Sequence, residues 1–487
     1  PDGDTEPAGF SAVAASPGVA AAPRRPVPRS AARSGSPARP ASAPELPRAE
    51  SSRRALHNTR DGHIPRAASP SGAWQPSPVR VRRPQRLLGV DAARAVALAG
   101  MASVHIMPVV TADGRETVAG ALAAGRASAL FAVLAGVGVA LATGGPHPPC
   151  ARREEPAPAV PSPRSGAGSA PRAYAGAAAG LLVRGVLVAS VGLALVALDP
   201  PVAVILAYYG LLFAVATPLL RLRTPALAVL AAVWCVAGPV ASHVLRAGRR
   251  ALPGDQPGFG ALAAPADLFR ELAVTGYYPV LPWLTYLLAG MAVGRADLRS
   301  TRVAGWLLGG GVALAVAAAA GSAVLLGSGG GAAALGPELA RRRYGTVPTD
   351  TWWWLAVEAP HTGTPFDLAH TTGTALAVLG AALLVARFAP RVLWLPAAVG
   401  ALPLTLYTLH VTALALYPPE AAEADGTSAG TLLVVHLVVA LAIGVLVRVA
   451  GLRGPLEAGI GAVAGAVRRV VVGRAVAVPG PVSASRS

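Results

Sequence analysis

The sequence predicts an all-α protein, a polytopic bundle of about ten transmembrane helices that follows a disordered N-terminal tail. Three observations lead to this prediction. Of the 487 residues, 53% are hydrophobic and only 14% are charged, and the mean hydropathy is +0.51, which is typical of membrane proteins. Apolar segments of about 17 to 25 residues, the length that crosses a bilayer as a helix, recur along the chain. Arginines gather in every second connection between these segments.

The predicted tail covers residues 1–85. It is rich in Pro, Ala, Ser and Arg and poor in large apolar side chains, so it cannot bury enough surface to offset the entropy lost on ordering. The formal charge of +18 comes from arginine alone, because the chain has no lysine and a single asparagine, Asn58. Such a skew indicates a coding bias, and no nucleic-acid partner is therefore predicted.

Ten apolar segments are expected to cross the membrane within one domain, residues 86–457. They cover residues 90–109, 127–143, 176–198, 202–220, 226–245, 278–293, 303–326, 368–386, 395–417 and 431–447. A Pro-rich linker at 144–172, expected to be flexible, and an external loop at 327–365 interrupt the domain. Residues 458–487 are expected to form a C-terminal cytoplasmic tail.

The distribution of arginine predicts the orientation of the helices. Basic connections of membrane proteins face the cytoplasm, and every second connection here is basic. We therefore expect a multi-pass protein of the cell membrane with both termini in the cytoplasm and residues 420–425 outside. One connection departs from the pattern, because it is expected outside yet carries Arg246, Arg249 and Arg250. The cytoplasmic arginines are Arg80, Arg82, Arg83, Arg86, Arg152, Arg153, Arg164, Arg172, Arg221, Arg223, Arg295, Arg299, Arg302, Arg387, Arg391, Arg448 and Arg453.

The segment "DAARAVALAGMASVHIMP" keeps three polar residues in an apolar run. Asp91 precedes Arg94 by three residues, which allows an ion pair. Arg94 and His105 are nearly three helical turns apart, so they share one face and lie about 16 Å apart along the axis. Taken singly, the pair is explained as a cytoplasmic anchor and His105 as a buried packing residue. The shared face favours a common cavity, with a charged cluster inside and an imidazole outside.

A second polar cluster lies in "PHTGTPFDLAHTTGTAL". Thr364 is predicted to cap a helix that begins at the following proline, which gives Asp367 a structural explanation in the first turn. His370 and Thr371 nevertheless follow Asp367 by three and four residues on one face. A carboxylate that orients an imidazole is the arrangement that a general base requires, so Asp367 and His370 are catalytic candidates. His361 opens the same segment and joins them.

Other polar residues within the spans are weaker candidates. Tyr407 and His410 are three residues apart and are candidates for substrate binding, although packing between helices explains them as well. Arg184 lies in the third span, where it either reaches the cytoplasmic surface or binds an anionic group such as a phosphate. His436 has no polar companion nearby and is interpreted as structural, and His243 at the end of the fifth span is interpreted in the same way. The sequence has no phosphate loop, nucleophile elbow or Cys/His metal spacing, and no metal is expected.

The segment "RLLGVDAARAVALAGMASVH" resembles the first-helix signature of the transmembrane acyltransferases. In that signature a basic residue, an aspartate and an Arg-Gly pair precede an apolar helix that ends in His or Asn. The chain is similar to bacterial proteins with the catalytic domain of heparan-alpha-glucosaminide N-acetyltransferase and to the related DUF418 membrane proteins. The motifs "SALFAVLAGVGVALATGG", "GYYPVLPWLTYLLAGMAVGR", "GALPLTLYTLH" and "RGPLE" support this. Ala95 departs from the signature, which has glycine there.

The resemblance implies a membrane enzyme that transfers an acyl group from acyl-CoA, in the first place acetyl-CoA, to an amine or hydroxyl of an extracytoplasmic sugar or envelope glycan. Asp91, Arg94 and His105 occupy the signature positions. His105, or the pair Asp367 and His370, would act as base, and Arg94 with Arg184 would bind the donor. The alternative is a transporter or flippase whose polar residues line a path through the membrane. Membrane lipid is an expected partner, and a homo-oligomer is compatible with these features.

Overall fold

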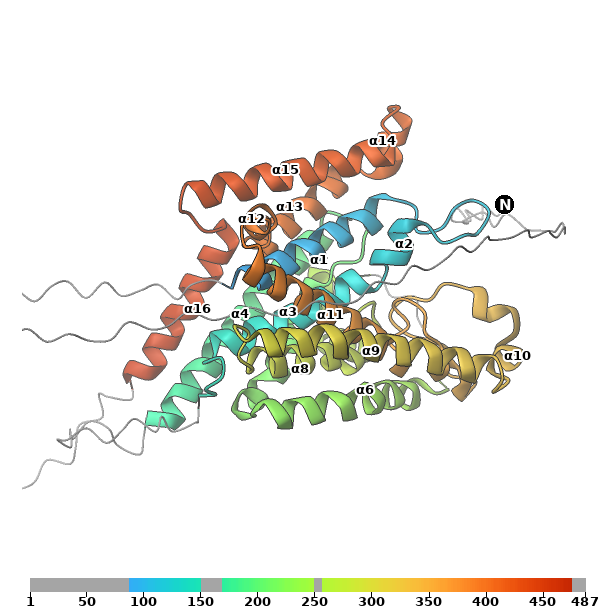
Figure 1. Ribbon diagram of the computed structural model, residues 1–487, viewed down its shortest axis with the longest axis horizontal. Helices are drawn as coiled ribbons and strands as arrows, with labels where there is room; N and C mark the ends of the chain where they lie inside the picture. Colours follow the sequence, from blue (N-terminus) through green and yellow to red (C-terminus); the bar gives the residue numbers. More distant parts are fainter. Residues whose placement is uncertain (1–86, 150–168, 249–255, 475–487) are drawn as a thin grey trace, which may run out of the picture. The chain divides into compact units, whose positions relative to one another are not determined.

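The computed structural model describes residues 87–149, 169–248 and 256–474, and regular structure in these ranges is helical apart from one antiparallel bridge between Val110 and Glu116. The predicted tail, most of the linker and the last residues lie outside the described ranges. The α-helices, labelled in part in Figure 1, are α1 (Leu88–Ile106), α2 (Val118–Ala123), α3 (Arg126–Ala142), α4 (Ser169–Val196), α5 (Leu206–Ala216), α6 (Thr224–Arg246), α7 (Pro265–Arg270), α8 (Val280–Gly294), α9 (Thr301–Leu326), α10 (Gly331–Leu335), α11 (Pro365–Phe388), α12 (Trp394–Val399), α13 (Pro403–Leu416), α14 (Pro419–Ala424), α15 (Ala429–Val449) and α16 (Pro455–Arg474).

Six helical segments of the described ranges are long and apolar enough to cross a membrane. They are Val118–Ala142, Ala170–Val196, Thr224–Arg246, Thr301–Leu326, Pro365–Phe388 and Ala429–Val449. The helical fold is confirmed, and nine of the ten predicted spans each overlap one α-helix. The predicted span 395–417 is wrong as a single helix, because a break at residues 400–402 separates α12 from α13. The helix that carries Asp91, Arg94 and His105 is not one of the six.

Residues 455–474 form α16, which the sequence did not indicate because its arginines leave no apolar run of membrane-spanning length. This helix packs along α4. Arg468 of α16 donates a hydrogen bond to the backbone oxygen of Ala142, at the C-terminal end of α3. The segment assigned to a tail is therefore, up to residue 474, part of the helical bundle.

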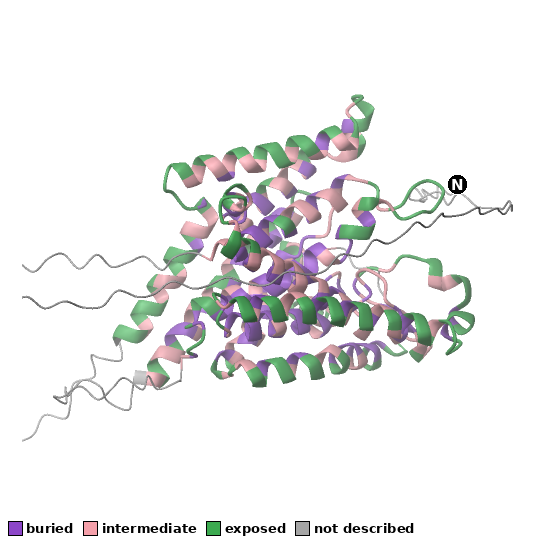
Figure 2. Cartoon of the chain, viewed as in Figure 1, coloured by how far each residue is buried: buried purple, intermediate pink, exposed green. Residues whose placement is uncertain are grey.

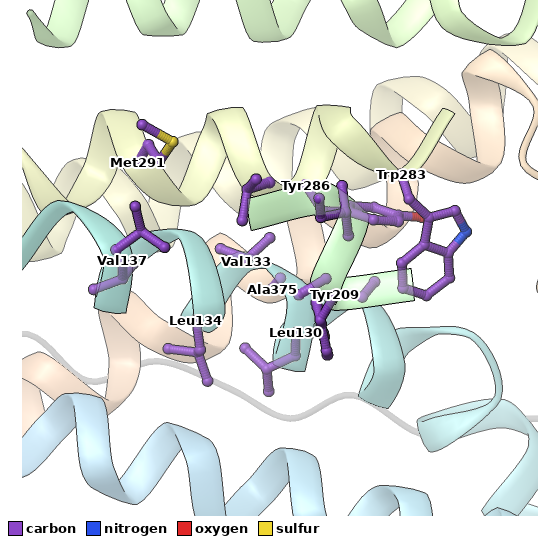
Figure 3. Close-up of a cluster of buried hydrophobic side chains, with 14 of the residues drawn as sticks. Leu130, Val133, Leu134, Val137, Tyr209, Trp283, Tyr286, Met291 and Ala375 are labelled. Carbon is purple, nitrogen blue, oxygen red and sulfur yellow. The ribbon is translucent and has the colours of Figure 1, made fainter. Parts of the chain in front are cut away.

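The core lies around α3 and α8, whose backbones approach closely at two glycines. A Cβ at Gly136 would overlap the backbone oxygen of Leu287, and one at Gly290 would overlap that of Val133. Such close approach of helices through small residues is typical of membrane proteins. Figure 3 shows the buried side chains that gather at this contact, and Figure 2 shows α9 and α15 exposing most of their surface.

The three tryptophans of the loop between α9 and α11 have different environments. Trp354 is buried against Leu335 and Val347 and donates a hydrogen bond to Asp350, whereas Trp352 is exposed. The ring of His243 stacks on Trp352 with 4.6 Å between centroids, which agrees with a structural role for this histidine. Trp354 therefore packs within the loop, whereas Trp352 lies at its surface.

Arg246 explains why its connection departs from the arginine pattern. Its guanidinium is buried and donates hydrogen bonds to Ser242 Oγ at 3.2 Å and to the backbone oxygen of Val347 at 2.6 Å. The arginine therefore ties the end of α6 to the long loop after α9, a role that does not depend on membrane topology. Arg249 and Arg250 lie outside the described residues.

Candidate active site

Helices α1, α3 and α11 pack against one another and define two ends of the bundle. At one end, which we call the arginine end, Arg94 of α1 lies beside Gly138 near the C-terminus of α3. At the other, which we call the histidine end, the last turn of α1 with His105 lies near the first turns of α3 and α11. Arg126 begins α3 and His370 lies in the second turn of α11.

The expected ion pair at the arginine end is confirmed. Arg94 Nη1 donates to Asp91 Oδ1 at 2.7 Å, and Asp91 is buried while the side chain of Arg94 is 22% exposed. The other terminal nitrogen of Arg94 is directed at α3, 3.6 Å from the place that a Cβ on Gly138 would occupy. A Cβ at residue 138 would be in ordinary van der Waals contact with this nitrogen, so the guanidinium lies against the backbone of α3. The pair thus reaches the interface between α1 and α3.

Arg184 is the second arginine that the sequence proposed for donor binding. Its side chain is exposed and forms no hydrogen bond or ion pair with a described residue, and its charged neighbours are Arg94 and Glu457. Glu457 is already engaged, because its carboxylate accepts hydrogen bonds from the backbone N–H of Leu404 and Thr405 at the start of α13. Arg184 therefore carries a positive charge that these groups leave available to an anion.

Arg295, which the sequence used only for orientation, is a central residue of the arginine end. It is 4% exposed, and its two terminal nitrogens donate to five acceptors. These acceptors are the backbone oxygens of Ala140, Thr143, Gly145 and Leu220 and the hydroxyl of Thr143, at distances of 2.9 to 3.3 Å. Arg295 thus joins the C-terminal ends of α3 and α8 to the 3₁₀ turn after α5 (Thr217–Arg221).

Three histidines meet at the histidine end, from α1, α13 and α15. His105 Nδ1 lies 3.1 Å from His410 Nε2, and the two rings are stacked with 5.3 Å between centroids. His436 meets His410 edge to face at 5.2 Å, so the interpretation that it has no polar companion is wrong. His410 is 305 residues from His105 and 26 residues from His436, so no local sequence pattern could reveal these contacts.

The remaining nitrogen of His105, Nε2, forms no hydrogen bond with a described residue. It is also not fully buried. One nitrogen of the ring is therefore held and the other is open. A general base needs this arrangement, because the held nitrogen fixes the orientation of the ring while the open one receives the proton.

His370 lies between Arg126 and Glu358 rather than beside Asp367. Arg126 Nε, which can only donate, donates to His370 Nε2 at 3.3 Å, so in the neutral ring the proton is on Nδ1. That nitrogen faces Glu358 Oε1 at 3.5 Å. The predicted pairing of Asp367 with His370 is therefore wrong, and the nitrogen that could accept a proton is occupied by Arg126.

Asp367 has a structural environment that the sequence predicted in part. Thr364 caps α11 by accepting from the N–H of Asp367 at 3.1 Å, as expected. The carboxylate then turns back to the loop, where its Oδ2 accepts from the N–H of Gly363 at 2.9 Å. The short polar turn before α11 therefore uses Asp367 to fix its own backbone. The other carboxylate oxygen is buried without a hydrogen bond to a described residue.

His361 connects this loop to the start of α3. Its Nε2 accepts a hydrogen bond from the N–H of Gly125 at 3.2 Å, and its backbone has a positive φ of 63°. Burial, followed by the positive charge of Arg342, lowers the pKa of His361 to about 4. The pKa of Glu358 in the same loop is raised, also by burial first. His361 is thus a neutral acceptor that closes the loop onto α3.

Tyr407 and His410 do not form a joint site. The hydroxyl of Tyr407 accepts from the N–H of Ile205 at 3.3 Å, and its ring is buried against Phe131. His410, one helical turn later, contacts His105 instead. The packing explanation therefore fits Tyr407, whereas His410 belongs to the histidine cluster.

Within the described ranges, no group of three or more His, Cys, Asp or Glu residues could hold a metal ion. Comparison with known proteins identifies one domain: residues 86–326 match the family model of the heparan-alpha-glucosaminide N-acetyltransferase catalytic domain. The match includes Asp91, Arg94, His105, Arg126 and Arg184, and it ends before Glu358, His370 and His410. No curated protein and no solved structure matches the chain.

Proposed function

Because residues 86–326 belong to the family of the heparan-alpha-glucosaminide N-acetyltransferase catalytic domain, we propose that the protein is an integral membrane acyltransferase. It takes an acyl group, in the first place acetyl, from cytoplasmic acyl-CoA and transfers it to an amine or hydroxyl of a sugar or envelope glycan on the other side of the cell membrane. Both termini are cytoplasmic in this proposal, which makes the arginine end the donor side.

The observation that carries the proposal is the state of His105. This residue lies inside the matched domain, its Nδ1 is held by His410, and its Nε2 is open. The same comparison supports His105 over His370 as the base, because the accepting nitrogen of His370 is occupied by Arg126. His105 is the better base by geometry.

The reaction that this arrangement supports is direct transfer. His105 Nε2 removes the proton from the acceptor amine or hydroxyl, and the acceptor attacks the carbonyl carbon of the thioester. The carbon–sulfur bond breaks, and the thiolate of CoA leaves and takes up a proton. His410 keeps the ring of His105 in place, and Arg126, which begins α3 at the same end of the bundle, supplies a positive charge that would favour a negatively charged intermediate there.

The donor is a polyanion, and the arginine end offers it cations. Arg184 is exposed and lacks an ion pair with a described residue, so it fits a phosphate group. Arg94 is held by Asp91, and its side chain is 22% exposed. Arg94 and His105 are separated by about 16 Å along α1, so the nucleotide part of the donor binds at one end while the reacting thioester lies toward the other.

The test is acyl transfer by the purified full-length protein in nanodiscs, with radiolabelled acetyl-CoA and a panel of sugars and glycans. We expect label in an acceptor with the unsubstituted protein and almost none with His105→Ala. His147→Ala is the matched control, since His147 is exposed in the connection after α3. Unchanged transfer by His105→Ala would remove this residue from the mechanism. Substrate movement in proteoliposomes without any dependence on CoA would favour the transporter instead.

A further inference from the structure

Helices α4 and α16 pack along each other (Figure 1) and bring four exposed arginines together next to the arginine end. A Cβ at Gly176 of α4 would lie 3.4 Å from the Cγ of Arg468 of α16. Two residues earlier in α4, the ring of Tyr174 has the guanidinium carbon of Arg221 at 3.9 Å from its centroid. The arginines thus gather around the first turns of α4. We call them the basic surface: Arg172, Arg221, Arg468 and Arg469.

The basic surface lacks a negative partner, because none of its arginines forms an ion pair with a described residue. Helix α4 contains no Asp or Glu, and the one acid of α16, Glu457, accepts hydrogen bonds at the start of α13. Arg468 donates to the backbone oxygen of Ala142 at 3.2 Å, whereas Arg172 and Arg469 form no hydrogen bond with a described residue. The surface therefore carries positive charge that is available to an anion.

The length of α4 places this surface at the level of lipid head groups. The apolar segment Ala170–Val196 has 27 residues. A helix of this length is roughly 40 Å long, whereas the hydrocarbon layer of a bilayer is about 30 Å thick. One end therefore extends beyond the hydrocarbon, and it is the end with Arg172, because a charge in hydrocarbon is costly.

Exposed aliphatic side chains of α16 accompany the arginines. Val463, Ala466 and Val470 are exposed and recur with the spacing of one helical face, and Arg469 lies beside this face. Helix α16 is not among the helices that are long and apolar enough to cross a membrane. A helix with adjoining basic and apolar faces is instead typical of the bilayer interface, where the apolar side chains reach the acyl chains.

We propose that the basic surface, together with these aliphatic side chains, binds a phospholipid whose head group carries a net negative charge, as phosphatidylglycerol does. Its phosphate accepts hydrogen bonds from the arginines, and its acyl chains cover Val463 and Val470. A soluble anion such as the acyl donor would satisfy the arginines and leave the exposed aliphatic face in water. The proposal depends neither on acyl transfer nor on which end of the bundle faces the cytoplasm.

The experiment measures the dissociation constant of lipid for the purified full-length protein in detergent, by native mass spectrometry. Phosphatidylglycerol and phosphatidylcholine with the same acyl chains are titrated separately. We expect phosphatidylglycerol to bind at least about tenfold more tightly, since each basic side chain near an anionic head group contributes a factor of about five. Glycerol 3-phosphate, which has no acyl chains, should not displace phosphatidylglycerol at an equal concentration.

Three double variants test the assignment to α4 and α16. Arg172→Gln with Arg469→Gln removes two arginines that make no hydrogen bond with a described residue, so folding should be kept. The dissociation constant of phosphatidylglycerol should rise at least about tenfold, and that of phosphatidylcholine should not change. Lysine at the same two positions keeps the charge and should retain the affinity. Arg387→Gln with Arg391→Gln is the matched control, since both arginines are exposed at the C-terminal end of α11, and it should leave the affinity unchanged.

Equal dissociation constants for the two lipids in the unsubstituted protein overturn the proposal. It is also overturned if the control pair on α11 weakens phosphatidylglycerol as much as the glutamine pair on α4 and α16. Displacement of phosphatidylglycerol by acetyl-CoA or by glycerol 3-phosphate would assign the arginines to a soluble anion. None of these measurements requires acyl transfer, so failure of the lipid site is distinguishable from failure of the proposed reaction.

Discussion

The two ends of the bundle use polar residues differently. At the arginine end, Arg295 donates to five acceptors and Arg94 is paired with Asp91. At the histidine end, His105 and His436 each keep one ring nitrogen without a hydrogen bond to a described residue. The difference indicates that the arginine end mainly holds helices together, whereas the proposed transfer assigns the proton to the ring nitrogen that His105 leaves open at the histidine end.

Each end also has one residue that departs from this division. Arg184 lies at the arginine end but is exposed and forms no ion pair within the described ranges. His361 lies at the histidine end, yet its acceptor nitrogen is used to hold a loop against α3. The difference between the two ends is therefore best tested by substituting, at each end, one residue that follows this division and one that departs from it.

Arg295→Ala should have the largest effect, and the effect should be on stability. The substitution leaves four buried backbone oxygens and the hydroxyl of Thr143 without their donor, which costs about 4 kcal/mol in free energy of unfolding. Thermal unfolding in detergent should show a large decrease in midpoint or a loss of folded protein. Arg299→Ala is the control, because Arg299 is exposed in the same connection. A stable Arg295→Ala protein that has lost transfer would reverse the assignment of the arginine end.

His105→Ala should have the next largest effect, on activity and not on stability. Loss of a general base lowers kcat by about a hundredfold at least, while the thermal midpoint should remain within a few degrees. His370→Ala should lower kcat by less than about tenfold, because the accepting nitrogen of His370 is occupied by Arg126. The opposite order of the two variants would move the base from α1 to α11.

Sequence patterns predicted the local features of this molecule and missed those that depend on distant contacts. The Asp91–Arg94 pair follows from spacing within one helix, and the Thr364 cap follows from the residues after it, so both were predictable. The contact of His105 with His410 joins residues 305 apart, and no pattern within either helix indicates it. Apolar neighbours of His436 in the sequence concealed its position beside His410.

Spacing was also misleading where a loop competes for the same side chain. Asp367 and His370 are three residues apart and were expected to pair. The backbone N–H of Gly363 instead binds the carboxylate of Asp367, and Glu358 comes from the loop to face His370. The sequence 395–417 is similarly apolar throughout, and only the structure shows that it is divided into two helices. Local propensity does not determine which of two partners a buried polar group will take.

His361→Gln tests the structural residue of the histidine end through pH. Because the pKa of His361 is about 4 in the folded protein and near 6.5 in the unfolded chain, the unfolded state binds a proton first as the pH falls. The stability contributed by neutral His361 is complete above pH 6.5 and is lost toward pH 4, by about 2 kcal/mol at pH 5 relative to pH 8. His361→Gln, which does not titrate, should lose less stability over this range in thermal unfolding.

The difference between the two proteins isolates His361 from Glu358. The raised pKa of Glu358 means that the folded protein takes up its proton first, so this carboxyl has the opposite effect on stability as the pH falls. It contributes equally to both proteins and cancels in the comparison. His147→Gln serves as the control for a histidine that is exposed. Parallel pH profiles for the unsubstituted protein and His361→Gln would show that this histidine does not hold the loop.

Arg184→Gln should have the smallest effect and should act on donor binding alone. An exposed guanidinium that contacts a phosphate contributes a screened interaction, so the KM for acetyl-CoA should increase about fivefold while kcat changes little. The increase should shrink as salt is added, because added ions screen the same contact in the unsubstituted protein. Arg302→Gln is the matched control, since Arg302 is an exposed arginine in the first turn of α9. Equal KM values for the two variants would show that Arg184 does not bind the donor. A fall in stability with Arg184→Gln would place Arg184 with Arg295 among the residues that hold helices together.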